Sequence, residues 1–230
     1  MLKKPIIGII CRKFIIDGES VFQLNTDYYS AIVKNGGIPL GVFSSDYCIQ
    51  NNNSNFLSDE SISDLDNILS KCNGILMTGG YNWNKCDEYI LEYALKNDIP
   101  ILGICLGMQI MGSMDFFNSD MPDRTIRNDT IINHFQKGKQ YVHKCKILDG
   151  LLYKILKKNS IVVNSRHNYH IEDRKYFNID AYSEDGLIEA ISIENHKFAL
   201  GVQWHPESMI DYDEDMFKIF KAFIEASIQS

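Results

Sequence analysis

The first half of the chain alternates short apolar runs with stretches of helical periodicity, and this alternation constrains the fold more than any other feature. Isoleucine-rich runs of this length are typical of strands buried on both faces of a parallel sheet. Helices must then link the strands and cover the sheet. We predict strands over residues 5–11, 38–43, 74–80 (with a turn at its end) and 100–104, and helices over 24–34, 62–71, 86–96 and 106–114.

The second half has a different pattern. Residues 116–139 show no clean periodicity, and the polar stretch 46–63 of the first half is also predicted to be mostly loop. Residues 187–194 and 199–204 predict a hairpin that turns at 194–197. Extended segments are predicted over 141–148, 161–164 and 177–182, and helices over 151–157 and 213–227. No linker or repeat divides the 230 residues, so we expect one domain spanning 1–230.

Composition excludes several classes of protein. A net charge of −7 argues against a nucleic-acid or anionic-membrane binder. No apolar run reaches the ~20 residues needed to span a bilayer, and the first residues do not resemble a signal peptide. The six cysteines form no CxxC pair and no Cys/His metal spacing. We therefore expect a cytoplasmic protein with neither metal nor cofactor.

Cys105 has a special local context. It follows an apolar run, is flanked by Gly103 and Gly107, and precedes a predicted helix. A strand that turns sharply into a helix presents one side chain at its apex, and glycines allow the backbone to pack tightly around such a turn. A helix N-terminus or a nearby imidazole activates a thiol. The alternative is a buried core cysteine, which the glycine frame disfavours.

One hundred residues later, the chain supplies an imidazole and a carboxylate. His205 and Glu207 are two positions apart, so on an extended backbone they face the same way. Glu207 can then orient the ring while the ring serves the thiol. A structural, hydrogen-bonded histidine is the alternative for His205. Attack on an acyl carbon also requires N–H donors for the oxyanion, for which we predict the amides of Leu106, Gly79 and Gly80.

These segments together resemble the class I glutamine amidotransferase family. Gly103-Ile-Cys-Leu-Gly-Met-Gln109 is similar to its nucleophile motif, and Gln203-Trp-His-Pro-Glu207 is similar to its His/Glu motif. Finer features resemble the gamma-glutamyl hydrolases of the peptidase C26 group: Val163-Asn-Ser-Arg-His167, Glu189-Ala-Ile-Ser-Ile193 and 198–207. The resemblance covers nearly the whole chain, from Pro5 to about Phe223. It implies an α/β, flavodoxin-like fold: a mostly parallel central sheet with helices on both faces and an additional antiparallel hairpin.

The resemblance also implies a reaction. Cys105 would attack a gamma-glutamyl carbonyl, His205 would move the proton, and water would release glutamate from a thioester. Gln109, Ser165 and His167 match positions that line the substrate pocket in relatives. His134, Gln136 and His143 resemble a His-x-Gln…His stretch of the family; their alternative is surface polar residues on an irregular segment.

The chain departs from the family pattern in two places. Only residues 81–85 separate Gly80 from the next helix, where gamma-glutamyl-GABA hydrolases carry a longer acidic insertion, and the segment from Gly112 also differs. Both departures fall near the expected mouth of the pocket, on the side that would hold the leaving amine. The leading hypothesis is a stand-alone gamma-glutamyl amide hydrolase. A homodimer is compatible with this hypothesis. The alternatives are a glutaminase subunit that passes ammonia to a separate synthetase partner, and a catalytically silent binding module.

Overall fold

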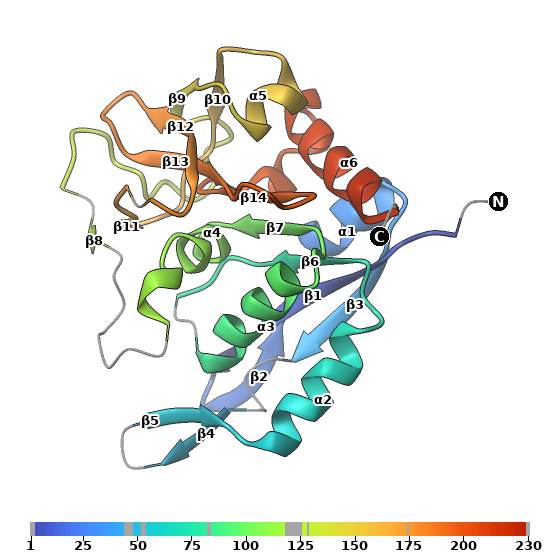
Figure 1. Ribbon diagram of the computed structural model, residues 1–230. Helices are drawn as coiled ribbons and strands as arrows, with labels where there is room; N and C mark the ends of the chain where they lie inside the picture. Colours follow the sequence, from blue (N-terminus) through green and yellow to red (C-terminus); the bar gives the residue numbers. More distant parts are fainter. Residues whose placement is uncertain are drawn as a thin grey trace.

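One mixed sheet organises the molecule. The computed structural model describes residues 3–43, 48–51, 54–81, 84–117, 126–127, 129–173 and 175–228. Ten strands form the main sheet in the order β10-β9-β12-β13-β14-β7-β6-β1-β2, with β3 paired to β1. Strands from both halves of the chain therefore lie in the same sheet, and helices cover both of its faces (Figure 1).

The parallel part of the sheet positions the candidate site. It consists of β3 (Ile38–Phe43), β1 (Ile6–Ile16), β6 (Gly74–Met77), β7 (Ile101–Ile104) and β14 (Ala199–Val202), paired in that order. All of β6, β7 and β14 is buried. The strand predictions at 38–43, 74–80 and 100–104 are thus confirmed, and for β6 and β7 the continuous apolar run corresponds to burial between two helical layers.

Antiparallel strands extend the sheet beyond β14. They are β13 (Ile188–Ser192), β12 (Asn178–Ser183), β9 (His143–Ile147) and β10 (Ser160–Val163). The predicted hairpin is the β13–β14 pair, and it belongs to a larger antiparallel region. A second hairpin, which the sequence did not predict, joins β1 to β2 (Glu19–Gln23), because β1 continues to Ile16 rather than ending near residue 11.

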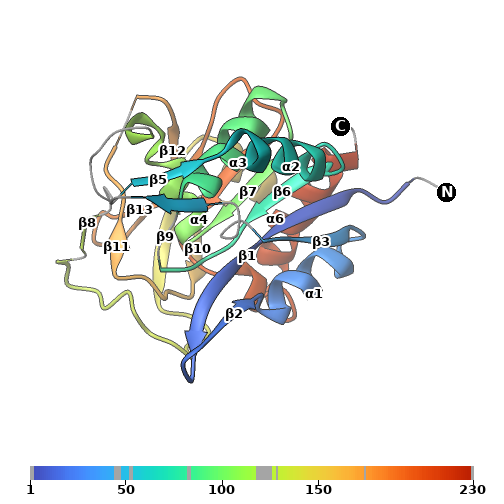
Figure 2. The ribbon, with the colours of Figure 1, turned by 90° about the horizontal axis from the view of Figure 1, so that it is seen from below.

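Two apolar cores lie on opposite faces of the sheet. Helices α1 (Thr26–Lys34), α5 (Leu151–Leu156) and α6 (Glu214–Ile228) pack on one face. Helices α2 (Asp59–Leu69), α3 (Lys85–Lys96) and α4 (Leu106–Met111) pack on the other (Figures 1 and 2). Among the residues that the structure describes, no helix is both long enough and apolar enough to cross a membrane.

Some boundaries differ from the sequence predictions. The stretch 46–63 is not mostly loop: it contains the hairpin β4 (Cys48–Asn51) and β5 (Ser54–Leu57), and α2 begins at Asp59. The Ser58 side chain caps α2 by accepting from the Ser61 amide, a polar signal that also suits a loop. Helix α4 ends at Met111, and a 3₁₀ turn (η2, Met114–Phe116) follows. Strands β8 (Ile126–Arg127) and β11 (Tyr169–His170) form a separate short pair.

Candidate active site

Cys105 lies at a strained turn between β7 and α4. Its backbone has φ 53° and ψ −104°, an unusual conformation for a residue with a side chain. The flanking glycines make the turn possible. A Cβ at Gly107 would lie 2.2 Å from the carbonyl oxygen of Met77, and one at Gly103 would lie 2.8 Å from the Gly107 backbone. The thiol is therefore presented at the carboxyl end of β7, as the Gly-x-Cys-x-Gly pattern predicts.

His205 and Glu207 reach the thiol from β14, the parallel neighbour of β7. The Nδ1 atom of His205 is 2.7 Å from Oε1 of Glu207, and the imidazole also hydrogen-bonds to Cys105. Glu207 lies in the 3₁₀ turn η3 (Pro206–Ser208) rather than on the extended backbone that the spacing suggested. The structure nevertheless brings the thiol, ring and carboxylate together in the predicted order.

The carboxylate controls the charge on the ring. Burial lowers the pKa of His205, but the negative charge of Glu207 and the hydrogen bond with Cys105 outweigh burial and raise the pKa to about 10. His205 therefore carries a proton at neutral pH in the free protein, and this places a positive charge beside the thiol. Glu207 itself is almost completely buried.

Asn164 holds the His205 backbone in place, a role that sequence reasoning missed. Its side-chain oxygen accepts from the His205 amide at 2.8 Å, and its side-chain nitrogen donates to the His205 carbonyl at 2.8 Å. Asn164 is fully buried at the end of β10. Because the two residues are distant in sequence, only their placement in the fold could have identified this contact.

The Thr78-Gly79-Gly80 turn lies against the thiol and ring. A Cβ at Gly79 would be 3.0 Å from His205 Cε1 and 3.5 Å from Cys105 Cβ. However, the Gly79 amide donates to the Tyr28 hydroxyl at 3.0 Å, so it already has an acceptor in the free protein. Tyr28 is buried and also hydrogen-bonds to Glu207. Burial and the Glu207 charge raise the pKa of Tyr28 well above its usual value.

A cavity of about 260 Å³ opens above Cys105. Its lining includes Cys105, His205, Gly79 and Gly80, together with three cationic side chains that the sequence did not single out: Arg12, Lys137 and Arg166. Arg12 is fixed by Asp87, 2.6 Å away, and by the Thr78 carbonyl. The cavity is therefore suited to a small anionic ligand whose reactive carbon reaches the thiol.

Three predicted substrate-binding residues lie elsewhere. Gln109 donates to the Tyr169 carbonyl and to the Gln203 side chain, and it is buried below the turn. Ser165 donates to the His134 carbonyl, and His167 lies close to Glu189. None of the three is among the residues that line the cavity described above. Their contact with substrate stays a prediction.

His134 and His143 are buried, at 2% and 3% exposure, so the surface alternative is wrong for both. Gln136 is half-buried, and its side chain donates to the Asn133 carbonyl. The two histidines lie together with His167 and Glu189 in one buried cluster.

Fold and site together define a hydrolase of the class I glutamine amidotransferase type, which acts on carbon–nitrogen bonds. The peptidase C26 family profile matches residues 84–207, more than half of the chain, and the chain belongs to this family. The matched span contains Cys105, His205 and Glu207.

Relatives in sequence and structure support this assignment. The gamma-glutamyl-gamma-aminobutyrate hydrolase PuuD of Escherichia coli is 27% identical over 234 residues, covering 90% of this chain and 87% of that protein. The CTP synthase of Methanosphaera stadtmanae is 30% identical over 188 residues, which cover 70% of this chain but 35% of the synthase. The glutaminase domain of Trypanosoma brucei CTPS with bound acivicin shares the fold, with a TM-score of 0.67, 18% identity and coverage of 98% and 94%.

Proposed function

We propose that this protein is a stand-alone cysteine hydrolase that cleaves a gamma-glutamyl amide and releases glutamate and an amine. The observation that carries the proposal is the hydrogen-bonded series Cys105–His205–Glu207 at the base of a cationic cavity. The likeness to PuuD, which covers most of both chains, favours a gamma-glutamyl amide as the substrate class.

The proposed reaction has two steps. The Cys105 sulfur, as the thiolate of an ion pair with protonated His205, attacks the gamma-carbonyl carbon, and the carbon–nitrogen bond breaks as His205 gives its proton to the leaving amine. A gamma-glutamyl thioester and a neutral His205 result. His205 then takes a proton from water, whose oxygen attacks the thioester carbon, and the carbon–sulfur bond breaks to release glutamate and restore the thiolate–imidazolium pair. Glu207 orients the ring and stabilises its charge throughout.

The developing oxyanion needs two donors. The Leu106 amide is one, because the first amides of a helix have no acceptor within the helix. We propose that the Gly79-Gly80 turn supplies the other. Since the Gly79 amide already donates to Tyr28, Gly80 is the better candidate of the two.

Cationic side chains in the cavity suit the alpha-carboxylate of a glutamyl group. Arg12 is buried, and two of its nitrogens are occupied by Asp87 and Thr78, while its Nε has no hydrogen-bond acceptor among the described residues. Arg166 lines the same cavity and donates to Ser208. An Arg-held carboxylate would fix the substrate at one end and leave its amide carbon at the thiol.

The second candidate function is a glutaminase subunit that delivers ammonia to a separate synthetase. Likeness to CTP synthases favours it, because the matched part of the Methanosphaera enzyme is about a third of that protein. The two functions differ in substrate: a glutaminase prefers free glutamine and responds to its partner. A silent binding module, the third possibility, would turn over neither.

A panel of gamma-glutamyl amides that includes glutamine tests the proposal. Glutamate release is measured for the wild type, for Cys105→Ala and for Cys72→Ala, a control that changes another buried free cysteine away from the cavity. We expect turnover of a gamma-glutamyl amine in the wild type and the control and none in Cys105→Ala. Preference for glutamine, with stimulation by a synthetase, would favour the second candidate instead.

A further inference from the structure

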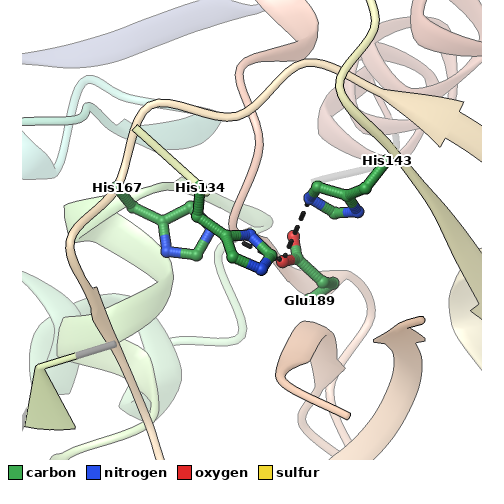
Figure 3. Close-up of side chains that lie close together, drawn as sticks. All are labelled: His134, His143, His167 and Glu189. Atoms are coloured by element: carbon green, nitrogen blue, oxygen red, sulfur yellow. Dashed lines mark ion pairs between the residues drawn. The ribbon is translucent and has the colours of Figure 1, made fainter. Parts of the chain in front are cut away.

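Three histidines and a glutamate meet in the interior, apart from the cavity above Cys105. His134, His143, His167 and Glu189 are all buried, and one potential ligand atom from each lies within 4.8 Å of the others. The histidine rings converge on the Glu189 carboxylate (Figure 3). A buried carboxylate is costly unless strong partners compensate for the water it has lost.

The distances are too long for hydrogen bonds to supply that compensation. Oε1 of Glu189 is 3.5 Å from His134 Nδ1, 3.4 Å from His143 Nε2 and 3.4 Å from His167 Nε2. Charge-assisted N–H···O bonds are ~2.7–2.9 Å long. Within the described part of the chain, neither Glu189 oxygen accepts a hydrogen bond.

The outer partners of the rings determine which nitrogen faces Glu189 as an acceptor. His134 Nε2 is 3.1 Å from the Asp185 carboxylate, and His167 Nδ1 is 3.0 Å from the Tyr169 carbonyl. Both oxygens only accept, so in a neutral ring each holds the ring proton on its own side. The opposite nitrogens then direct lone pairs toward the Glu189 carboxylate, and the Ser165 hydroxyl also lies 3.3 Å from Nδ1 of His134.

His143 has the same arrangement with weaker contacts. Its Nδ1 is 3.5 Å from the Lys144 carbonyl and 3.7 Å from the Cys145 sulfur, and its Nε2 faces Glu189. Histidines that bind metals usually donate the other ring N–H to a carboxylate or a backbone carbonyl, which fixes the tautomer. His134 and His167 have such a partner, whereas the contacts of His143 Nδ1 are too long to fix its tautomer.

We propose that His134, His143, His167 and Glu189 form a four-coordinate site for a divalent transition metal, Zn²⁺ in the first instance. Zinc bonds of ~2.0–2.1 Å in tetrahedral geometry put ligand atoms about 3.3–3.4 Å apart. The three nitrogen–oxygen distances above already match this value. The widest ligand separation, 4.8 Å, would have to close by about 1.4 Å, which small side-chain rotations can provide. Four protein ligands leave no open position, so the ion is structural.

A bulge in the sheet aims Glu189 at the cluster. Ala190 is paired with Ala181 and Ile188 with Tyr182, so β13 has one extra residue, Glu189, against β12. Bulges of this kind redirect a side chain. His143 begins β9, two strands away, and the other two ligands come from irregular segments.

The site would stiffen the wall of the catalytic cavity. Phe135 and Lys137, one and three residues after His134, line that cavity, and so does Arg166, the residue before His167. An ion that joins both segments to the sheet would hold these side chains in place. Metal removal should then raise KM more than it lowers kcat, since Cys105 and His205 follow β7 and β14 and lie outside the two joined segments.

Zn²⁺ binding is tested without substrate, in the Cys105→Ala background so that the thiol cannot bind the ion. Calorimetric titration of chelator-treated protein should give one Zn²⁺ per chain. Glu189→Gln, nearly isosteric, should weaken binding by ~100-fold or more. The matched control His196→Ala changes a partly buried histidine whose ring lies near Asp98, and it should leave binding unchanged.

Cobalt provides a readout in the Cys105→Ala background alone, with all four proposed ligands unchanged. Co²⁺ bound by the chelator-treated background protein should give the intense visible absorption of a tetrahedral ion, and Zn²⁺ should abolish it by displacement. Zn²⁺ should also raise the thermal midpoint of this protein. A background protein that binds neither ion in a one-to-one ratio, or a Glu189→Gln variant that folds and binds Zn²⁺ as tightly, would overturn the site.

Discussion

Substitution of Gly107 by alanine tests how tightly the turn at Cys105 is packed. In a helix, alanine is intrinsically favoured over glycine by about 1 kcal/mol, so propensity alone predicts stabilisation. Packing predicts the opposite. The added Cβ would lie 2.2 Å from the Met77 carbonyl oxygen, a backbone atom that cannot rotate away. Strand β6 and helix α4 would have to separate by roughly 0.8 Å, and overpacking of this kind costs ~1–3 kcal/mol.

The same displacement should impair catalysis. Moving α4 away from β6 shifts Cys105 and Leu106 relative to the Gly79-Gly80 turn, and a misplacement near 1 Å can cost ~10²-fold in rate. We therefore expect Gly107→Ala to lose about 3 kcal/mol in urea unfolding and ~10²-fold in kcat/KM.

Gly41→Ala is the matched control for this prediction. Its Cβ would meet no atom closer than 3.3 Å, and Gly41 lies on the exposed side of β3, so we expect a change within about 0.5 kcal/mol. If Gly107→Ala unfolds at the wild-type urea midpoint and retains wild-type kcat/KM, the packing argument is refuted.

Three further predictions concern the ring, its support and the substrate. Because the folded-state pKa of His205, about 10, lies above its ordinary value of 6.5, protonated His205 stabilises the fold fully below pH 6.5, and this contribution is lost as pH rises through 10. In Glu207→Gln the free energy of unfolding should no longer fall between pH 6 and pH 10 in this way. If unfolding at pH 6, 8 and 10 shows the variant losing as much stability as the wild type, the prediction is contradicted. Asn164→Ala removes both side-chain contacts to the His205 backbone, so kcat should fall ~10–100-fold at a cost of ~1–3 kcal/mol in stability, whereas unchanged kcat would show that β14 alone positions the ring. Finally, the short segment 81–85 and the altered segment 113–116 predict that the glutamyl half is required and that the best amine is not GABA; a panel in which gamma-glutamyl-GABA wins by a wide margin would refute this.

Much of the fold could be predicted from the sequence, because buried parallel strands consist of continuous runs of apolar residues. The strands at Gly74–Met77 and Ile101–Ile104 are examples. The hairpin β4–β5 could not be predicted, since its Asn-rich segment is equally typical of a loop. The extension of β1 to Ile16 was missed because the apolar run ends at Cys11 and the charged residues Arg12 and Lys13 follow it.

The site divides in the same way. Cys105, His205 and Glu207 lie in two short motifs, and each motif can be recognised from consecutive residues of the sequence. Arg12 and Tyr28 contribute through contacts between residues that are far apart in sequence, so no local pattern marks them. Asn164 lies in the family-like segment Val163-Asn-Ser-Arg-His167, but its contact with the His205 backbone is visible only in the fold. The His134, His143, His167 and Glu189 cluster is similar: its members come from four separate segments without metal-ligand spacing, and only the fold brings them together.

The central claim is that Cys105 forms a covalent gamma-glutamyl thioester, and trapping that intermediate tests it most directly. Wild-type protein is mixed with a gamma-glutamyl amide, quenched in acid during turnover and digested for mass spectrometry. We predict a gamma-glutamyl adduct on the peptide that contains Cys105, no adduct on peptides with the other cysteines, and no turnover by Cys105→Ala. Turnover that persists in Cys105→Ala would contradict the account.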